Sequence, residues 1–181
     1  GLSRPHMPFK AVLMAILISP MIVPLIITAA GMFFFYSKIG LTHTYLGLIL
    51  AHTALGTPFV VITVTATLTG FDTNLIRASQ SLGADTMRTF FKVIMPLILP
   101  GVISGGLFAF ITSFDEVVIV MFVGSVEQIT IPKQMWAGLR QETSPVILCM
   151  ATCLVALSIA LLTTVEMLRR RSERLRGIKQ R

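Results

Sequence analysis

Charged residues are scarce in this sequence. Asp, Glu, Lys and Arg make up 13% of its 181 residues, whereas hydrophobic residues make up 54%. A soluble domain of this size carries about a quarter charged residues. The apolar residues also form long runs without a single Asp, Glu, Lys or Arg, at 11–35, 44–69, 93–114 and 146–165. This pattern excludes an ordinary soluble domain and indicates a membrane protein.

Cysteine and nucleotide-binding motifs are equally sparse. The two cysteines, Cys149 and Cys153, lie four residues apart in an apolar run with no His or carboxylate, so we predict packing residues and no metal site. His52 stands alone in another run and is interpreted as a helix-packing residue whose polar group is satisfied by a hydrogen bond. The sequence lacks the G-x-x-x-x-G-K-[ST] loop, so any ATP-dependent work must be done by another chain. We therefore expect no cofactor in this chain.

Each apolar run is long enough to cross a membrane as a helix, which takes about 20 residues. We place the spans at about 11–35, 44–69, 93–124 and 146–168. The predicted fold is therefore an all-α membrane protein with four transmembrane helices. As one helix, 93–124 would be about 48 Å long, so we expect a break or steep tilt near Phe114. Pro20 and Pro24 are expected to kink the first span.

Basic residues mark one side of the membrane. Of the 15 Lys and Arg residues, all but Lys38, Lys133 and Arg140 lie before the first span, between the second and third spans, or in the tail. Four spans place these three segments on the same side, and the positive-inside rule makes that side cytoplasmic. Both chain ends are therefore predicted to be cytoplasmic. The tail at 169–181 has no interleaved aromatic residues, so we expect it to lie beside anionic lipid and not to bind nucleic acid.

The segment 72–92 interrupts the apolar runs with signals for two short helices. Asp72 or Thr73 can cap the first helix, and Asp85 can cap the second. Gly83 between them suits the left-handed position that ends a helix. Such a compact cytoplasmic element could grip a partner protein or could be an ordinary interfacial loop, and the spacing alone leaves both open.

The same segment carries a family signature. Permease subunits of bacterial ABC importers contain E-A-A-x-x-x-G-x9-I-x-L-P, and residues 77–96 read Arg-Ala-Ser, three residues, Gly, nine residues, then Val-Ile-Met-Pro. Farther along, "SFDEVVIVMFVG" at 113–124 resembles the Ser-x-Asp-Asp/Glu-Val-Val segment of spermidine/putrescine-type permeases. Over essentially its whole length the chain is similar to the transmembrane subunit of a binding-protein-dependent, type I ABC importer.

The resemblance implies that 72–92 holds the coupling helix, which docks in a cleft on an ATP-hydrolysing subunit. The residues assigned to ATPase coupling are Arg77, Ala78, Ser79, Leu82, Gly83 and Ala84. Arg77 departs from the family's Glu and reverses a charge on the docking surface. Either the ATPase carries a compensating acidic site, or the Glu is dispensable in this branch. Permeases of this kind usually have more than four spans, so one or two N-terminal spans are expected to be missing.

The resemblance also implies partners and a location. ATP and Mg would be bound by partner ATPase subunits, and the complex would include a second permease subunit and an extracytoplasmic solute-binding protein. The chain would be a multi-pass protein of the bacterial cytoplasmic (inner) membrane. Its other contacts would be with membrane lipid, and no nucleic acid is expected.

Two acidic residues, Asp115 and Glu116, lie between apolar segments of the third span. Carboxylates near membrane depth usually line a cavity, and a polycation is a natural partner for them. Adjacent helical residues point about 100° apart, so both carboxylates cannot be buried at low cost. We place Asp115 first, and Glu116 second, in the substrate path. In the alternative, both lie in water at the outer interface and only end the helix. The glycines of this span, at 101, 105 and 106, are predicted to support close helix packing.

The function predicted from these features is that of an importer permease, not an enzyme. It would move a small cationic solute, with polyamine favoured, inward by alternating access coupled to a separate ATPase. One alternative is the same importer class acting on an opine, iron or phosphonate. Another is an ion-coupled secondary transporter, which normally carries coupling carboxylates on several spans. An intramembrane aspartyl protease is excluded because a second intramembrane Asp is missing.

Overall fold

The regular elements of the chain are helices throughout its described part. The computed structural model describes residues 7–141 and 145–175. In chain order the elements are α1 (Lys10–Ile22), α2 (Leu25–Ile39), α3 (Tyr45–Thr69), α4 (Asn74–Ser81), α5 (Thr86–Thr89), the π-helical segment η1 (Phe90–Ile94), α6 (Met95–Phe114), α7 (Val118–Val123), α8 (Ile131–Gln141) and α9 (Pro145–Leu175). The prediction of an all-α fold is confirmed.

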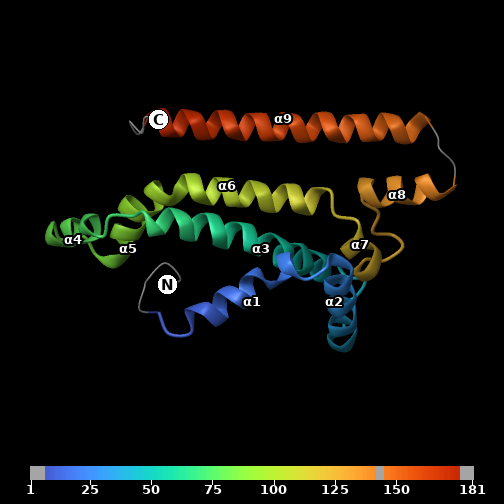
Figure 1. Ribbon diagram of the computed structural model, residues 1–181, viewed down its shortest axis with the longest axis horizontal. Helices are drawn as coiled ribbons and strands as arrows, with labels where there is room; N and C mark the ends of the chain where they lie inside the picture. Colours follow the sequence, from blue (N-terminus) through green and yellow to red (C-terminus); the bar gives the residue numbers. More distant parts are fainter. Residues whose placement is uncertain (1–6, 142–144, 176–181) are drawn as a thin grey trace.

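The long helices lie side by side and leave short elements at both ends of the bundle (Figure 1). Helix α6 lies between α3 and α9, and α1 contacts α3. Helices α4 and α5, in green, are at one end, where α9 also finishes. Helices α7 and α8 are at the opposite end. The bundle thus carries the helices α4 and α5 at one end and the short helices α7 and α8 at the other.

Three helical segments are long and apolar enough to cross a membrane: Tyr45–Thr69, Thr86–Phe114 and Pro145–Thr164. The pair α1 and α2 makes a fourth if both are counted as one bent span. These segments mark the chain as a multi-pass membrane protein. The count of four spans predicted from the sequence corresponds to the larger of these two numbers.

The apolar run at 11–35 changes direction between two separate helices, a larger bend than the kink predicted at Pro20 and Pro24. Helices α1 and α2 meet at an angle of 109°. Val23 between them is extended, with φ −72° and ψ 136°, as expected for a residue that precedes proline. Pro24 has no amide hydrogen with which to continue the hydrogen bonding of α1. Pro20 lies inside α1, so Pro24 is the proline that ends the helix.

Helices α3 and α6 make the closest helix contact, and two glycines of α6 allow it. Gly101 and Gly105 are buried, and they lie one turn apart on the same face of the helix. An added Cβ at Gly101 would collide with the Thr67 hydroxyl, and one at Gly105 would collide with the Thr63 hydroxyl. The predicted packing role is therefore confirmed for these two glycines.

For Gly106 the packing prediction is wrong. It is exposed, and an added Cβ there would have no neighbour within 4 Å, because its position is about 100° around the helix from Gly105. From the other side, α3 contributes Gly56, where a Cβ would lie 2.8 Å from the Cβ of Ala109. Small residues on both helices thus bring the two backbones together.

The third apolar segment is interrupted where a break was expected. Helix α6 ends at Phe114, and α7 begins only at Val118. The short α7 then packs into the main buried apolar cluster of the described residues, together with α2 and α3. That cluster consists of Ala29, Tyr36, Ala51, Leu55, Ile119 and Val123. The break thus turns the chain from the long bundle into a separate core beside its end.

Candidate functional site

The helix pair at one end of the bundle is held by local capping bonds. The Asp85 carboxylate accepts a hydrogen bond from the Arg88 amide at 2.6 Å and so caps α5, as predicted. At the start of α4, the Asp72 carboxylate accepts from the Asn74 amide at 2.9 Å. Gly83 has a φ of 80°, which is the left-handed conformation that glycine adopts without strain. These bonds fix a compact α4–turn–α5 element.

A side-chain contact joins the two helices of this element. The hydroxyl oxygens of Ser79 and Thr89 are 2.7 Å apart and share a hydrogen bond. Thr89 is only 2% exposed, although it lies in an otherwise exposed turn. The chain continues from Thr89 through η1 directly into α6. The Ser79–Thr89 hydrogen bond therefore links α4 to the start of the helical segment that continues into α6.

The residues predicted to couple to an ATPase lie together on this element. Arg77 and Ala78 are exposed on α4, Leu82 is 88% exposed at its end, and Gly83 is exposed in the turn. Ser79 and Ala84 are half-buried and complete the set. Beside them, Leu75 on α4 and Met87 on α5 are exposed as well. The element thus presents apolar side chains and a basic group to a neighbouring molecule.

At the opposite end of the bundle, the two acidic residues occupy different environments. Glu116 is 7% exposed, and its carboxylate accepts a hydrogen bond from the Ile119 amide at 2.9 Å. It therefore caps the first turn of α7, which is a structural role. Asp115 is exposed at the end of α6 and lines a cavity of about 450 Å³ that α8 and α9 also border. Of the pair, Asp115 is the carboxylate available to a solute.

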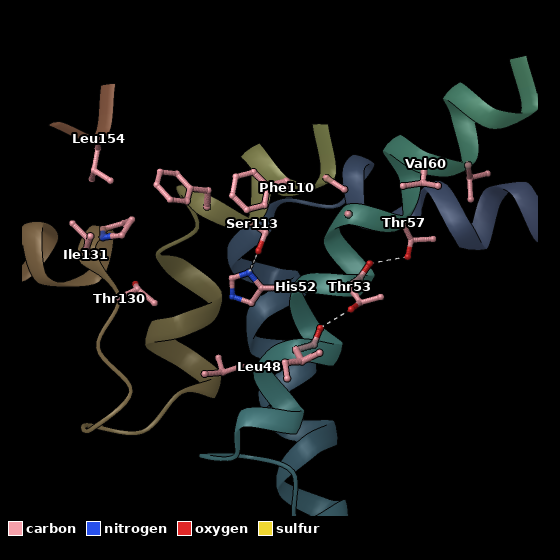
Figure 2. A pocket seen from close by; sticks show the side chains of 16 residues that line it. Leu48, His52, Thr53, Thr57, Val60, Phe110, Ser113, Thr130, Ile131 and Leu154 are labelled. Carbon is pink, nitrogen blue, oxygen red and sulfur yellow. Dashed lines mark hydrogen bonds between the residues drawn. The ribbon is translucent and has the colours of Figure 1, made fainter. Parts of the chain in front are cut away.

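A larger groove lies beside α3. It has a volume of about 930 Å³ and is bordered by α3, α6, the start of α8 and one residue of α9. Its polar lining residues are His52, Thr53, Thr57, Ser113 and Thr130. Figure 2 shows the His52 ring at the centre of this group, directed from α3 toward α6 and the loop that contains Thr130. The groove and the smaller cavity share Phe114, Pro132 and Leu154 as lining residues.

His52 is a satisfied helix-packing residue, as predicted, and it also lines the groove. Its Nδ1 is hydrogen bonded to the Ser113 hydroxyl at 2.8 Å, and the half-buried ring lines the groove. Sequence reasoning did not identify the partner or the groove, because Ser113 lies 61 residues away. A usable signal was present, since His52, Thr53, Gly56 and Thr57 recur at helical spacing on one face of α3.

A basic residue near the groove is already engaged. The Lys133 ammonium donates hydrogen bonds to the carbonyl oxygens of Ser125 at 2.9 Å and Gln128 at 3.2 Å. Gln128 is itself buried, and its side-chain oxygen accepts from the Ser125 amide at 2.8 Å. Lys133 therefore organises the loop between α7 and α8, and its charge is held by loop carbonyls.

The described residues contain no group of three or more His, Cys, Asp or Glu that could hold a metal ion. Cys149 and Cys153 are both exposed on α9. Their interpretation as residues that pack within this chain is therefore wrong. In Figure 1, α9 lies at the edge of the bundle formed by the described helices.

The chain is thus a bundle of apolar helices with a compact capped element at one end and a groove toward the other. The chain belongs to the family described as the binding-protein-dependent transport system inner membrane component, whose model matches residues 2–174. It is also similar to permease proteins of two bacteria and to one solved transporter structure.

The chain is 31% identical over 152 residues to the spermidine/putrescine transport system permease protein PotC of Haemophilus influenzae, covering 84% of this chain and 59% of that protein. It is 29% identical over 150 residues to PotC of Escherichia coli, covering 83% and 57%. It is 29% identical over 145 residues to the putrescine transport system permease protein PotI of Escherichia coli, covering 76% and 51%. The chain thus spans somewhat more than half the length of these relatives.

A solved structure gives the fold. The chain matches an inward-facing structure of the MetNI methionine ABC transporter with a TM-score of 0.72, covering 94% of this chain and 81% of that one. The two sequences are 21% identical. The match therefore confirms the predicted permease fold and carries no argument about the solute.

Proposed function

We propose that this chain is the permease of an ATP-driven importer that moves a small cationic solute inward, with a polyamine as the favoured solute. The observation that carries the proposal is its similarity to permease proteins of spermidine/putrescine and putrescine transport systems. The exposed carboxylate of Asp115, beside a cavity at one end of the bundle, supports the choice of a cation. Glu116 contributes negative charge from its buried capping position.

The α4–turn–α5 element is the proposed contact with the ATPase. It has the properties of a docking surface, since Leu82, Met87 and Leu75 are exposed apolar side chains on a rigid, capped scaffold. The exposed guanidinium of Arg77 lies on the same helix. A complementary cleft would be apolar with an acidic group opposite Arg77, because a desolvated charge needs an opposite one.

The proposed topology places this element and both ends of the chain in the cytoplasm. In Figure 1, α9 finishes at the end of the bundle that holds α4 and α5, which supports a common side for them. The proposed partners are ATPase subunits, a second permease subunit and an extracytoplasmic solute-binding protein. ATP and Mg would be held by the ATPase subunits and supply the energy of transport.

The coupling follows from the connections within the chain. When partner subunits move α4, the Ser79–Thr89 hydrogen bond carries that movement to α5, and the continuous helix carries it through η1 to α6. The far end of α6 bears Ser113 and Asp115, which line the groove and the cavity. Movement at one end thus changes the shape of the solute path at the other, as alternating access requires.

The test is uptake of labelled spermidine and putrescine by cells that carry the complex with its full-length permease. We compare wild type with Asp115→Asn and with Glu127→Gln, which removes an exposed carboxylate from the loop before α8. Wild type should accumulate polyamine, and Asp115→Asn should reduce uptake by about tenfold or more, since a hydrogen bond to a charged group contributes about 1.5–3 kcal/mol. Glu127→Gln should have little effect. If the wild type accumulates neither compound, the polyamine assignment is wrong.

A further inference from the structure

The groove beside α3 contains one imidazole among mostly apolar walls. We infer that this groove binds the aliphatic amine solute and that His52 accepts a hydrogen bond from one of its ammonium groups. The inference rests on the proposed function and extends it to a residue and a groove on α3. Its volume of about 930 Å³ lies within the range of small-molecule sites, roughly 300–1,000 Å³.

His52 offers a hydrogen-bond acceptor to the groove when its Nδ1 carries the proton, and the contact with Ser113 is compatible with that tautomer. Nδ1 is occupied by the Ser113 hydroxyl at 2.8 Å, and Nε2 lies on the opposite side of the ring, facing the groove (Figure 2). With Nδ1–H donated to the Ser113 oxygen, the neutral ring keeps its lone pair on Nε2. Ser113 thus positions the imidazole, and Nε2 is the atom offered to an ammonium N–H.

The hydroxyl groups of three other groove residues each make a hydrogen bond within the chain. The Thr53 hydroxyl donates to the Ile49 carbonyl at 2.7 Å, and the Thr57 hydroxyl donates to the Thr53 carbonyl at 2.7 Å. The Thr130 hydroxyl accepts from the Lys133 amide at 3.3 Å. A polyhydroxylated solute would lose its hydration to these walls and regain few hydrogen bonds. A chain of methylene groups with widely spaced amines suits them better.

The aromatic rings that line the groove and the carboxylate in the adjoining cavity favour a cationic solute. Phe110 and Phe114 line the groove, and their rings are stacked with centroids 5.7 Å apart, so they offer aromatic faces to a cation. Because Phe114 also borders the cavity of Asp115, a cation that leaves the groove meets a carboxylate next.

The test uses the complete complex, with its binding protein, in proteoliposomes supplied with labelled spermidine. His52→Phe keeps a ring in place but removes the acceptor, whereas His52→Gln keeps an acceptor oxygen. Thr57→Val is the matched control, since it changes a groove residue whose hydroxyl is bonded within α3. We measure the KM and maximal rate of uptake, and co-purification of the ATPase subunits in the same preparations.

We expect His52→Phe to raise the KM for spermidine about tenfold, the effect of one lost hydrogen bond to a charged group. His52→Gln should restore most of the affinity, and Thr57→Val should resemble wild type. The ATPase subunits should co-purify normally with all three variants, because α4 and α5 lie far along the bundle from the groove. Equal uptake by wild type and His52→Phe would overturn this inference alone. So would a loss of the co-purified ATPase subunits in both His52 variants, which would indicate a purely structural role. Absence of spermidine uptake by wild type would overturn the polyamine proposal and this inference together.

Discussion

Ser79 of α4 and Thr89 of α5 face each other across the turn, with their hydroxyl oxygens 2.7 Å apart. Thr89 is almost fully buried, and it is the last residue before the π-helical segment that leads into α6. A single hydrogen bond thus joins the exposed docking helix to the longest continuous span of the described residues. The first prediction concerns this link.

Thr89→Val should weaken coupling while leaving the fold intact. Valine keeps the shape of threonine but removes the hydroxyl, at a cost of about 1 kcal/mol for the lost hydrogen bond. The Ser79 hydroxyl would keep its second contact, the Ile76 carbonyl at 3.2 Å. Solute taken up per ATP hydrolysed should fall, whereas Ser81→Ala should not change it, because the Ser81 hydroxyl bonds only within α4. An unchanged ratio for Thr89→Val would show that the link carries no movement.

Gly105→Ala should destabilise the bundle. The added methyl group would collide with the Thr63 hydroxyl and approach the Val60 Cα at 2.8 Å. Overpacking of this kind costs about 1–3 kcal/mol. The melting temperature of the purified complex should therefore drop. The neighbouring Gly106→Ala is the control, and it should be neutral or slightly stabilising, since its Cβ meets open space and alanine favours helix. Equal stability of the two variants would contradict the tight α3–α6 contact.

Gly83→Ala should disturb the docking element. With φ at 80°, an alanine would be held in the left-handed region at a cost of about 1–2 kcal/mol. Gly70→Ala is a suitable control, because Gly70 has an ordinary φ of −85° and little around it. Co-purification with the ATPase subunits should decrease for Gly83→Ala and stay normal for Gly70→Ala. Full recovery of ATPase with both variants would argue against the proposed docking surface.

Arg77→Glu should weaken ATPase binding. The side chain is exposed on α4, so its charge is available to an acidic partner site, and reversal would place like charges together. The effect should be largest at low salt, since the screening length is about 10 Å at 0.1 M and shortens at higher ionic strength. Lys38→Glu, at the end of α2, controls for net charge. Equal binding of wild type and Arg77→Glu at low salt would indicate that the family's Glu position is dispensable here.

Local features of the fold could be predicted from the sequence. The cap on α5 joins Asp85 to an amide three residues away, and the left-handed turn needs only Gly83. Both follow from chemistry within a few residues. The break after Phe114 was predictable because the apolar segment is longer than a membrane is thick. The length and spacing of such runs therefore carried the prediction of an all-α membrane fold.

Features that depend on distant contacts could not be predicted in the same way. The pairing of His52 with Ser113 requires α3 and α6 to lie at a particular rotation and register. The same register decides that Gly105 is buried and Gly106 is exposed. The 109° bend between α1 and α2 depends on how α2 packs against α7 as well as on Pro24. Periodicity identifies a helix face, but the neighbour of that face is set by tertiary packing.

The glycine contacts between α3 and α6 have a mechanical consequence. Helices whose backbones meet this closely cannot slide past each other, so they act as one lever with the docking element at one end and the groove at the other. With 20 residues, α6 is about 30 Å long. Tilting a rod of that length by about 10° moves its far end by about 5 Å, close to the rise of one helical turn. A tilt of α6 that starts at α4 would therefore be amplified to about the rise of one helical turn at the groove.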